Sequence, residues 1–393
     1  MLIQAASTSV SIGKSITNMH RSLREVLDLY DDQAPLAEAF TIPAPWYVDP
    51  RIADLEASAV FARTWQMVGR VEQVAAPGRF VTATIAGEPI VVIRGADGNL
   101  RAFFNVCRHH AAAVVTEAFG QASILHCPYH GWNYGLDGSL KGMPEFDGVK
   151  DFERSRNGLL PVRVETWENF VFVNLDLQAA PLADFLGGLV KRVAPLGISK
   201  LKYFDSRVYE IACNWKVFVD NYLDGGYHVP HLHKGLSSVL DYKEYTIETE
   251  DRFCLQSSPM MASNEDALTG ATRKGDRARY FWQYPNLMIN CYEGYMDTNL
   301  TLPVGADHCR VIFDFYFADV SDALRTFNEE SVGVGARVQD EDLGICEAVQ
   351  RGLKSRAYGA GRLSVRREAG EHLFHRLLAA DLKAGLKIAE AAD

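Results

Sequence analysis

The stretch Asn214–His233, NWKVFVDNYLDGGYHVPHLH, holds three of the eleven histidines of this 393-residue chain, with acidic and amide residues close by. If residues 215–227 form a helix, steps of three and four place Asn221, Asp224 and His228 on one face. A helix face that carries an amide, a carboxylate and an imidazole is suited to binding a polar ligand or a metal ion.

The end of this stretch adds a second imidazole. Pro230 disfavours helix at the residue before it, so we expect the helix to end near His228 and His233 to follow from a loop or a new turn. Two imidazoles held in this way can take neighbouring positions on one metal, and two histidines with one carboxylate are typical of non-haem Fe(II) oxygen chemistry. A helix end with a few surface histidines would show the same spacing, so the interpretation depends on the rest of the chain.

Composition limits the classes of function. The net charge of −10 argues against nucleic acid or an anionic membrane as the main partner. No apolar run approaches the length of a membrane span, and seven cysteines without a secretory signal favour a reducing, cytoplasmic setting. The first 24 residues lack acidic residues and are rich in serine and threonine. They fit an organellar transit peptide, although we favour a frayed N-terminus.

Hydrophobic spacing divides the chain into three regions, 1–44, 45–176 and 177–393. The first is predicted to be a helical arm, because Leu23, Val26, Leu27 and Tyr30 fall on one helical face. A short helix over 51–65 introduces the second region, after which the apolar period changes to two. We expect strands there at 80–85, 89–94, 100–106, 123–126, 132–134, 160–164 and 170–174. The second region is therefore predicted to be a small all-β module.

Two loops of this module each carry a cysteine and a histidine. Cys107-Arg-His109 and Cys127-Pro-Tyr-His130 form a C-x-H-x17-C-x2-H pattern. Such a set could hold zinc, but zinc fingers usually pair cysteine with cysteine and histidine with histidine. The mixed halves suit a Rieske [2Fe–2S] cluster, in which both sulfurs bind one iron and both imidazoles bind the other. We predict these four residues as cluster ligands and the adjacent His110 as a non-ligand.

Four further stretches support a family resemblance over nearly the whole chain. They are DNYLDGGYHVP at 220–230, YPNLMIN at 284–290, MDTN at 296–299, and the segment 338–353. With the cysteine–histidine motif, they resemble the catalytic α-subunits of Rieske non-haem iron oxygenases, in particular the choline monooxygenase type. The resemblance implies an α+β fold, with an all-β Rieske domain followed by a helix-grip catalytic domain of antiparallel sheet and helices.

The third region fits this expectation. A strand at 203–212 precedes the helix of the opening stretch, and we expect three or four strands between about 244 and 318. Polar turns are predicted at 262–270 and 305–307. A long sheet folded around helices would account for this order of elements.

A third metal ligand is predicted at Asp342. It lies within an apolar stripe at helical spacing made by Val338, Ile345, Cys346, Val349 and Leu353. A lone carboxylate on a buried face is costly unless something positive meets it, and a metal bound by the two histidines would do so. A partly exposed aspartate at the edge of the stripe is the other interpretation, and Asp340 is the nearby alternative ligand. The family resemblance also places the ligand at Asp342.

The resemblance implies how electrons and oxygen are used. A ferredoxin or a flavin/iron–sulfur reductase would pass electrons from NAD(P)H to the Rieske cluster and then to a mononuclear Fe(II) that reacts with O2. Because the two metals of one chain lie too far apart in this family, a homo-oligomer is implied, a trimer or a multiple of it.

A carboxylate is expected to bridge His130 of one subunit to His228 of the next. Asp224 is our candidate and Asp220 the second choice. In many relatives this carboxylate stands three residues before the first iron histidine, where this chain has Gly225. A local bulge at Gly225-Gly226 could restore the geometry, because glycine is costly in a plain helix.

The substrate is less clearly encoded. A quaternary ammonium group needs aromatic faces, and aromatic residues gather at Phe281, Trp282, Tyr284, Tyr292 and Tyr295. With a period of two, at most half of them can point inward, and ordinary core packing would explain the same stripe. Asp297 or Glu293 could supply an acid for the cation.

Four functions remain open at this stage. They are hydroxylation of choline to betaine aldehyde hydrate, N-demethylation of a betaine, dihydroxylation of an aromatic ring, and electron transfer by a Rieske carrier. A pocket with an arginine and no inward acid would favour an aromatic acid. His228, His233 and Asp342 argue against a carrier, because a carrier needs no second metal.

Overall fold

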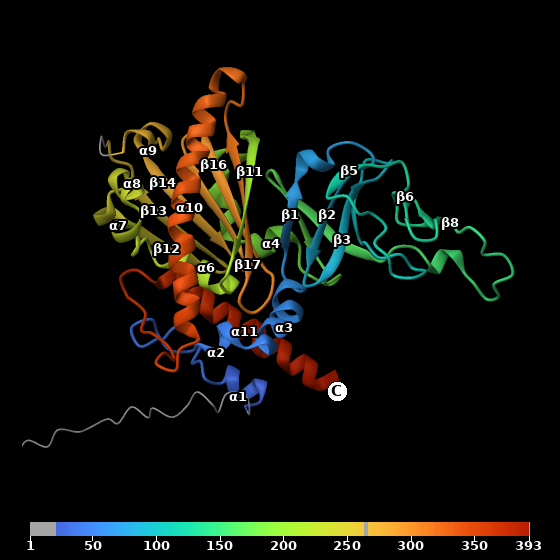
Figure 1. Ribbon diagram of the computed structural model, residues 1–393, viewed down its shortest axis with the longest axis horizontal. Coiled ribbons are helices and arrows are strands. Elements are labelled where there is room, and N and C mark those ends of the chain that lie inside the picture. Colours follow the sequence, from blue (N-terminus) through green and yellow to red (C-terminus); the bar gives the residue numbers. More distant parts are fainter. Residues whose placement is uncertain (1–20, 263–265, 393) are drawn as a thin grey trace, which may run out of the picture.

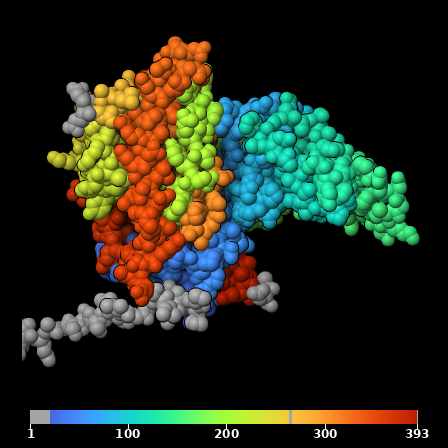
Figure 2. Space-filling model, viewed as in Figure 1, coloured from blue at the N-terminus to red at the C-terminus, as the bar shows by residue number. Residues whose placement is uncertain are grey.

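The computed structural model describes residues 21–262 and 266–392 and arranges them in two lobes (Figure 1). A β-lobe projects like an arm from a large lobe, in which long helices lie across one antiparallel sheet (Figures 1 and 2). This is the predicted α+β class. The segment that would fit a transit peptide falls almost wholly in residues 1–20, which lie outside the described residues. The division of the chain at residues 44 and 176 stays a prediction.

The described part of the N-terminal arm, residues 21–44, packs beneath the large lobe (Figure 1). Its helix α1 (Leu23–Leu27) is only five residues long, and Ser22 and Glu25 form a capping box at its start. Val26, Leu27 and Tyr30 are buried, as the predicted apolar face requires. Helix α2 (Pro45–Val48) follows, and the helix predicted at 51–65 is α3 (Pro50–Glu56), continued by the π-helical turn η2 (Ala57–Phe61).

The β-lobe contains a seven-stranded antiparallel sheet and a small three-stranded sheet. In spatial order the large sheet is β1 (Gln66–Arg70), β10 (Phe170–Asn174), β9 (Pro161–Trp167), β4 (Leu100–Phe104), β3 (Glu88–Arg94), β2 (Arg79–Ile85) and β5 (Phe119–Gln121). The small sheet is β6 (Leu125–His126), β7 (Asn133–Tyr134) and β8 (Leu140–Gly142). The first cysteine–histidine loop follows β4, and the second joins β6 to β7.

The large lobe is built on a second seven-stranded antiparallel sheet. Its spatial order is β11 (Lys202–Ile211), β17 (Cys309–Phe317), β16 (Tyr295–Pro303), β15 (Leu287–Tyr292), β14 (Arg277–Gln283), β13 (Phe253–Pro259) and β12 (Thr246–Glu250). Short helices α4 (Leu182–Leu186) and α5 (Gly188–Val193) connect the lobes. The remaining helices are α6 (Trp215–Leu223), α7 (Val229–Leu232), α8 (Lys234–Val239), α9 (Ala267–Thr272), α10 (Arg325–Leu353) and α11 (Ala369–Ala392).

Two sequence predictions for this lobe were wrong. Six strands, not three or four, lie between residues 244 and 318, because β12 is almost wholly exposed and β13 is buried although it contains Gln256, Ser257 and Ser258. Neither strand shows the apolar alternation by which a strand is recognised. The turn predicted at 262–270 contains the start of α9, which Asp266 caps.

The stripe predicted on α10 was also partly wrong. Ile345 and Val349 are 42% and 44% exposed, whereas Cys346, Leu353 and Asp342 are buried as expected. The buried face also carries polar side chains such as Gln350, whose Oε1 accepts a hydrogen bond from Asn214 N–H at 2.9 Å. A stripe defined by hydrophobicity alone therefore does not coincide with the face of α10 that is buried.

A buried ion pair fixes α6 against the N-terminal helices. Lys216 Nζ lies 2.5 Å from Glu56 Oε1, and Trp215 Nε1 donates to Glu56 Oε2 at 2.8 Å. Both charged side chains are almost fully buried, so each depends on the other for compensation. This contact holds the first turn of α6 and thereby the helix that carries Asn221.

Candidate active site

The helix of the opening stretch ends earlier than predicted. Helix α6 stops at Leu223, because Gly225 and Gly226 take left-handed backbone angles (φ +68° and +67°) that glycine adopts without strain. His228 then directly precedes α7, where Pro230 occupies the first turn, a position at which proline is tolerated. The left-handed turn at the two glycines places His228 beside Asp224, and the single helical turn of α7 brings His233 next to His228.

Three predicted metal ligands converge at one point. His228 Nε2 lies 3.0 Å from His233 Nε2, and Asp342 Oδ1 lies 3.1 Å from His233 Nε2 and 3.8 Å from His228 Nε2. Two nitrogens about 2.1 Å from one metal and at right angles to each other stand about 3 Å apart, so the imidazoles fit a shared metal. The alternative ligand Asp340 is exposed and does not belong to this group.

Neighbouring carboxylates orient both imidazoles. Asp224 Oδ2 lies 2.6 Å from His228 Nδ1, and Glu341 Oε2 lies 2.6 Å from His233 Nδ1. With Nδ1 donating to a carboxylate, each Nε2 keeps its lone pair for a metal. Asn221 Nδ2 donates to Asp342 Oδ1 at 2.9 Å, which orients the third ligand. Sequence reasoning missed Glu341, although its position next to a predicted ligand was an available signal.

Of the two bridging candidates, only Asp224 reaches the metal site. Asp220 instead accepts hydrogen bonds from Tyr47 (2.5 Å) and from His375 Nε2 (3.0 Å). Asp224 and Asp220 are one helical turn apart, but the left-handed turn after α6 brings only Asp224 beside His228.

A small cavity adjoins the three ligands. Its volume is about 120 Å³, far below the roughly 300–1,000 Å³ of drug-sized pockets, so it suits a small molecule. Tyr280 and Tyr292 line it from β14 and β15, and their hydroxyls are 2.8 Å apart. The other aromatic residues of the lining are Phe218, Tyr222, Tyr245 and Phe313. Burial raises the pKa of Tyr292 to about 12, so these hydroxyls stay protonated.

Besides the metal ligand Asp342, this cavity is lined by one further acid, Asp297, and by one arginine, Arg273. Asp297 is buried and accepts hydrogen bonds from Tyr295 (2.7 Å), Asn290 (2.7 Å) and Asn299 (3.0 Å). Burial raises the pKa of Asp297, and those donors oppose the shift. Arg273 is also buried, and its guanidinium contacts Ser331 Oγ at 2.7 Å and lies over the Tyr295 ring at 4.3 Å.

Several predicted substrate residues lie elsewhere. Trp282 shares a strand face with Tyr280 but lies further along β14, where it packs on Phe374 of α11. Tyr284 donates to Asp381 of α11 at 2.9 Å, and Phe281 belongs to the core on the opposite sheet face. Glu293 is exposed in the turn between β15 and β16. Tyr292, Tyr295 and Asp297 are the predicted members that the structure places at or beside the cavity.

The two cysteine–histidine loops meet at the end of the β-lobe. Cys107 and Cys127 are buried in the same hydrophobic cluster, while His109 and His130 lie with ring centroids 4.8 Å apart. His109 stacks on Trp132 at 4.8 Å, and its buried Nδ1 has no hydrogen-bond partner among the described residues. A buried imidazole nitrogen without a hydrogen-bond partner is what a metal ligand without its metal presents, and with His130 and the two buried cysteines it fits an iron–sulfur cluster.

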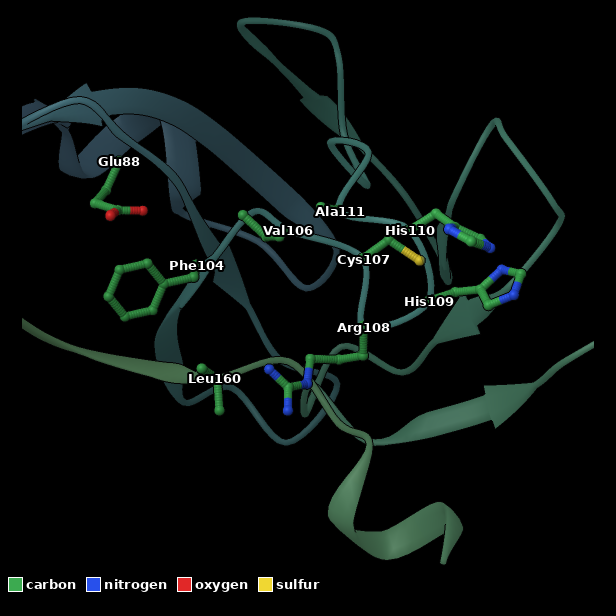
Figure 3. Close-up of a pocket in the computed structure, with 9 residues that line it drawn as sticks. All are labelled: Glu88, Phe104, Val106, Cys107, Arg108, His109, His110, Ala111 and Leu160. Carbon is green, nitrogen blue, oxygen red and sulfur yellow. The ribbon is translucent and has the colours of Figure 1, made fainter. Parts of the chain in front are cut away.

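A groove runs along the first loop. Figure 3 shows His109 and His110 on one side of the loop, whereas Glu88, Phe104 and Leu160 lie on the other. The groove has a volume of about 710 Å³, and Cys107 and Arg108 line it. His110 is exposed, with its ring 4.1 Å from that of His109.

Comparisons with known proteins assign the family. The Rieske [2Fe-2S] domain family matches residues 64–153, and the ring hydroxylating alpha subunit (catalytic domain) family matches residues 198–384. The chain belongs to the Rieske non-haem iron oxygenases. It is 39% identical to the chloroplastic choline monooxygenase of Arabidopsis thaliana over 90% of this chain and 86% of the relative. It is also 34% identical to the carnitine monooxygenase oxygenase subunit of Escherichia coli (strain K12), over 87% of this chain and 94% of the relative.

Solved structures agree. A quaternary ammonium Rieske monooxygenase superposes with a TM-score of 0.80 at 32% identity, covering 87% of this chain and 95% of that one. That structure is described as giving insight into carnitine oxidation and inter-subunit electron transfer. Naphthalene 1,2-dioxygenase from Rhodococcus sp. shares the fold (TM-score 0.73, 21% identity, covering 88% of this chain and 94% of that one).

Membership confirms the cofactors predicted from the motifs. The family contains a Rieske [2Fe–2S] cluster and a mononuclear iron, uses O2 and electrons from a reductase, and forms oligomers. The chain is therefore an oxygenase and not a simple electron carrier. Within residues 21–262 and 266–392, none of the helices combines the length and apolar character needed to cross a bilayer.

Proposed function

We propose that this enzyme hydroxylates a small quaternary ammonium compound such as choline, giving betaine aldehyde hydrate from choline. The observation that carries the proposal is the small cavity beside the three metal ligands, which presents tyrosine faces and a buried Asp297. Aromatic faces attract a desolvated quaternary ammonium by ~0.5–2 kcal/mol each, and a nearby carboxylate complements its charge. The resemblance to choline and carnitine monooxygenases supports the same substrate class.

Each predicted ligand has a role in this proposal. Cys107, His109, Cys127 and His130 would hold the Rieske cluster, and His228, His233 and Asp342 the mononuclear iron. When bound, the two metal centres supply the electron transfer and the oxygen chemistry. The protein orients both iron imidazoles through Asp224 and Glu341, and it orients the Asp342 carboxylate through Asn221.

The oligomer follows from the position of the two sites. The cluster loops beside β6 and the iron ligands beside α7 lie toward opposite sides of the molecule (Figure 1). Electrons would have to come from the cluster of a neighbouring subunit, which supports a trimer or a multiple of it. Asp224 already contacts His228, so it is our candidate for the carboxylate that meets the neighbour's cluster histidine. A ferredoxin or a flavin/iron–sulfur reductase would supply the electrons.

Arg273 supports a second candidate substrate. An aromatic acid is disfavoured because the cavity carries an inward acid, Asp297. A betaine, however, has both charges, and its carboxylate would meet Arg273, which has no carboxylate within 4.0 Å among the described residues. N-demethylation of a betaine is therefore the alternative reaction. We also propose a reducing, cytoplasmic setting, since all seven cysteines are unpaired.

Mass spectrometry of products would test the proposal. The holoenzyme, a surrogate reductase, NAD(P)H and O2 would be offered choline, glycine betaine and benzoate separately. Betaine aldehyde from choline supports the first reading, and formaldehyde from glycine betaine supports demethylation. Reaction with benzoate alone would contradict the quaternary ammonium proposal.

A further inference from the structure

A second cavity, which we call the acid cavity, lies against the iron site. Its volume is about 170 Å³, and Tyr47, Asp220 and Glu371 line it with Tyr358 and Asn221. The small cavity beside the three metal ligands is called the substrate cavity below. Asn221 lines it as well, and is the residue that the two cavities share. Two apolar residues of α10 that line the acid cavity, Ile345 and Val349, are about two-fifths exposed. The cavity therefore opens to the surface on that side.

Glu371 is the unusual group in this cavity. It is 6% exposed, and no described residue forms a hydrogen bond with its carboxylate; His375 Nε2 lies 3.8 Å from Glu371 Oε1. Burial raises the pKa of Glu371 well above its ordinary value, and the neighbouring carboxylates of Asp220, Glu368 and Asp224 raise it further. Burial without a hydrogen-bond partner therefore favours the protonated form of Glu371.

The remaining groups around Glu371 do not compensate a negative charge. Asp220 accepts hydrogen bonds from Tyr47 and His375 and is turned toward these two donors. Glu368 accepts from Ser364 N–H just before α11. The lining also contains three side chains without a formal charge: Tyr47 of α2, Cys346 of α10, and Tyr358, which follows α10.

Asp220, Glu371 and His375 are spaced like a metal-binding set, with ligand atoms within 4.8 Å of one another. The tautomer of His375 argues against a metal. Its Nδ1 accepts from Ile42 N–H at 3.4 Å, which places the ring proton on Nε2, where it donates to Asp220. A metal at Nε2 would move that proton to Nδ1, against the Ile42 donor. The hydrogen bonds of His375 to Ile42 and Asp220 therefore disfavour a metal ion at this cluster.

We propose that the acid cavity supplies protons to the iron site, with Glu371 as its buried proton donor. The inference rests on the proposed function, because hydroxylation consumes protons: R–H + O2 + 2 e⁻ + 2 H⁺ gives R–OH + H2O. The reductase supplies both electrons and the solvent supplies both protons. The volume of about 170 Å³ and the polar groups of Tyr47, Asp220 and Glu371 leave room and partners for water in this cavity. Glu371 passes its proton to that water beside Asn221 and regains one from solvent through the open side.

Asn221 controls the last step of this route. Its amide separates the acid cavity from the substrate cavity, and Nδ2 donates to Asp342 Oδ1 at 2.9 Å. When the amide turns away from Asp342, water in the two cavities becomes continuous. Glu371 is thus a proton-relay residue that acts through water and Asn221 and does not touch the substrate.

The test compares Glu371→Gln with Asp381→Asn in the holoenzyme. Asp381 lies on the same helix, and burial raises its pKa too, but it lines a different cavity. Both variants would be reduced chemically and mixed with O2 and choline, in H2O and in D2O, while O2 uptake and cluster reoxidation are recorded. In Glu371→Gln we expect O2 uptake and cluster reoxidation to be slower by about tenfold or more, with a larger solvent isotope effect and unchanged iron content. Asp381→Asn should behave as the wild type.

Two further measurements separate a relay from a structural role. Formate should restore the rate of Glu371→Ala, because the cavity is open to solvent, whereas chloride should not. In metal-free protein, the infrared carbonyl band of a protonated, deuterium-sensitive carboxyl should be present in the wild type and lost in Glu371→Gln. Any of three results would overturn the relay. They are wild-type rates and isotope effects in Glu371→Gln, a failure of formate to restore the rate of Glu371→Ala, and the absence of this infrared band in the wild type. If the substrate proposal fails instead, product is absent while O2 uptake still separates the two variants.

Discussion

Replacing Gly225 by alanine tests the left-handed turn on which the iron site depends. Alanine at φ +68° costs about 1–2 kcal/mol, because Cβ crowds the following carbonyl. The new Cβ would also lie 2.1 Å from the Arg367 carbonyl oxygen, a backbone atom that must move. Overpacking of this kind adds about 1–3 kcal/mol, so we expect a loss of about 2–5 kcal/mol in unfolding free energy.

Gly294→Ala is the matched control in the same lobe. Gly294 has a similar angle (φ +71°), but the nearest atom to its new Cβ is 3.8 Å away, an ordinary contact. It should therefore lose only the about 1–2 kcal/mol of backbone strain. Urea unfolding monitored by fluorescence would measure both, and an iron assay would show whether Gly225→Ala also loses the mononuclear iron. Equal losses in the two variants would refute the steric argument, and full iron content in Gly225→Ala would refute the link to His228.

Four other outcomes follow from the site. Asp342→Ala should lower the iron content from about three to about two atoms per chain and leave the cluster's visible spectrum unchanged; retention of all three would remove Asp342 from the ligand set. Asp224→Ala should keep both metals but lose turnover, and normal turnover would end its proposed bridging role. Tyr292→Leu should raise KM for choline by roughly 2- to 30-fold, which corresponds to ~0.5–2 kcal/mol, with little change in KM if the ring does not meet the cation. Glu371→Gln should become more stable relative to the wild type as pH rises above 4.5: a carboxyl whose folded pKa is raised loses stability from its unfolded pKa upward, and the amide does not titrate. Melting temperatures that differ by a constant amount from pH 4 to 8 would contradict this sign.

The sequence predicted the parts of the site whose chemistry is local. The C-x-H and C-x2-H loops identified a Rieske cluster, because mixed cysteine and histidine pairs at that spacing have few other uses. His228 and His233 were paired from a five-residue step, and Asp342 was selected because an aspartate within an apolar stripe needs a cation. Each inference depended on neighbours along the chain, which a sequence contains in full.

Only the tertiary structure decided which distant side chains meet. Trp282 and Tyr284 share the aromatic pattern of Tyr280 and Tyr292, yet α11 covers the first pair and leaves the second beside the iron ligands. Arg273 showed no signal, because a loop arginine is ordinary until it is buried against Tyr295. The choice between Asp220 and Asp224 likewise depended on a two-glycine turn, whose direction is set by backbone angles that the residue types permit but do not dictate. Spacing along a chain determines which residues share a face, and the packing of elements far apart in sequence determines what that face meets.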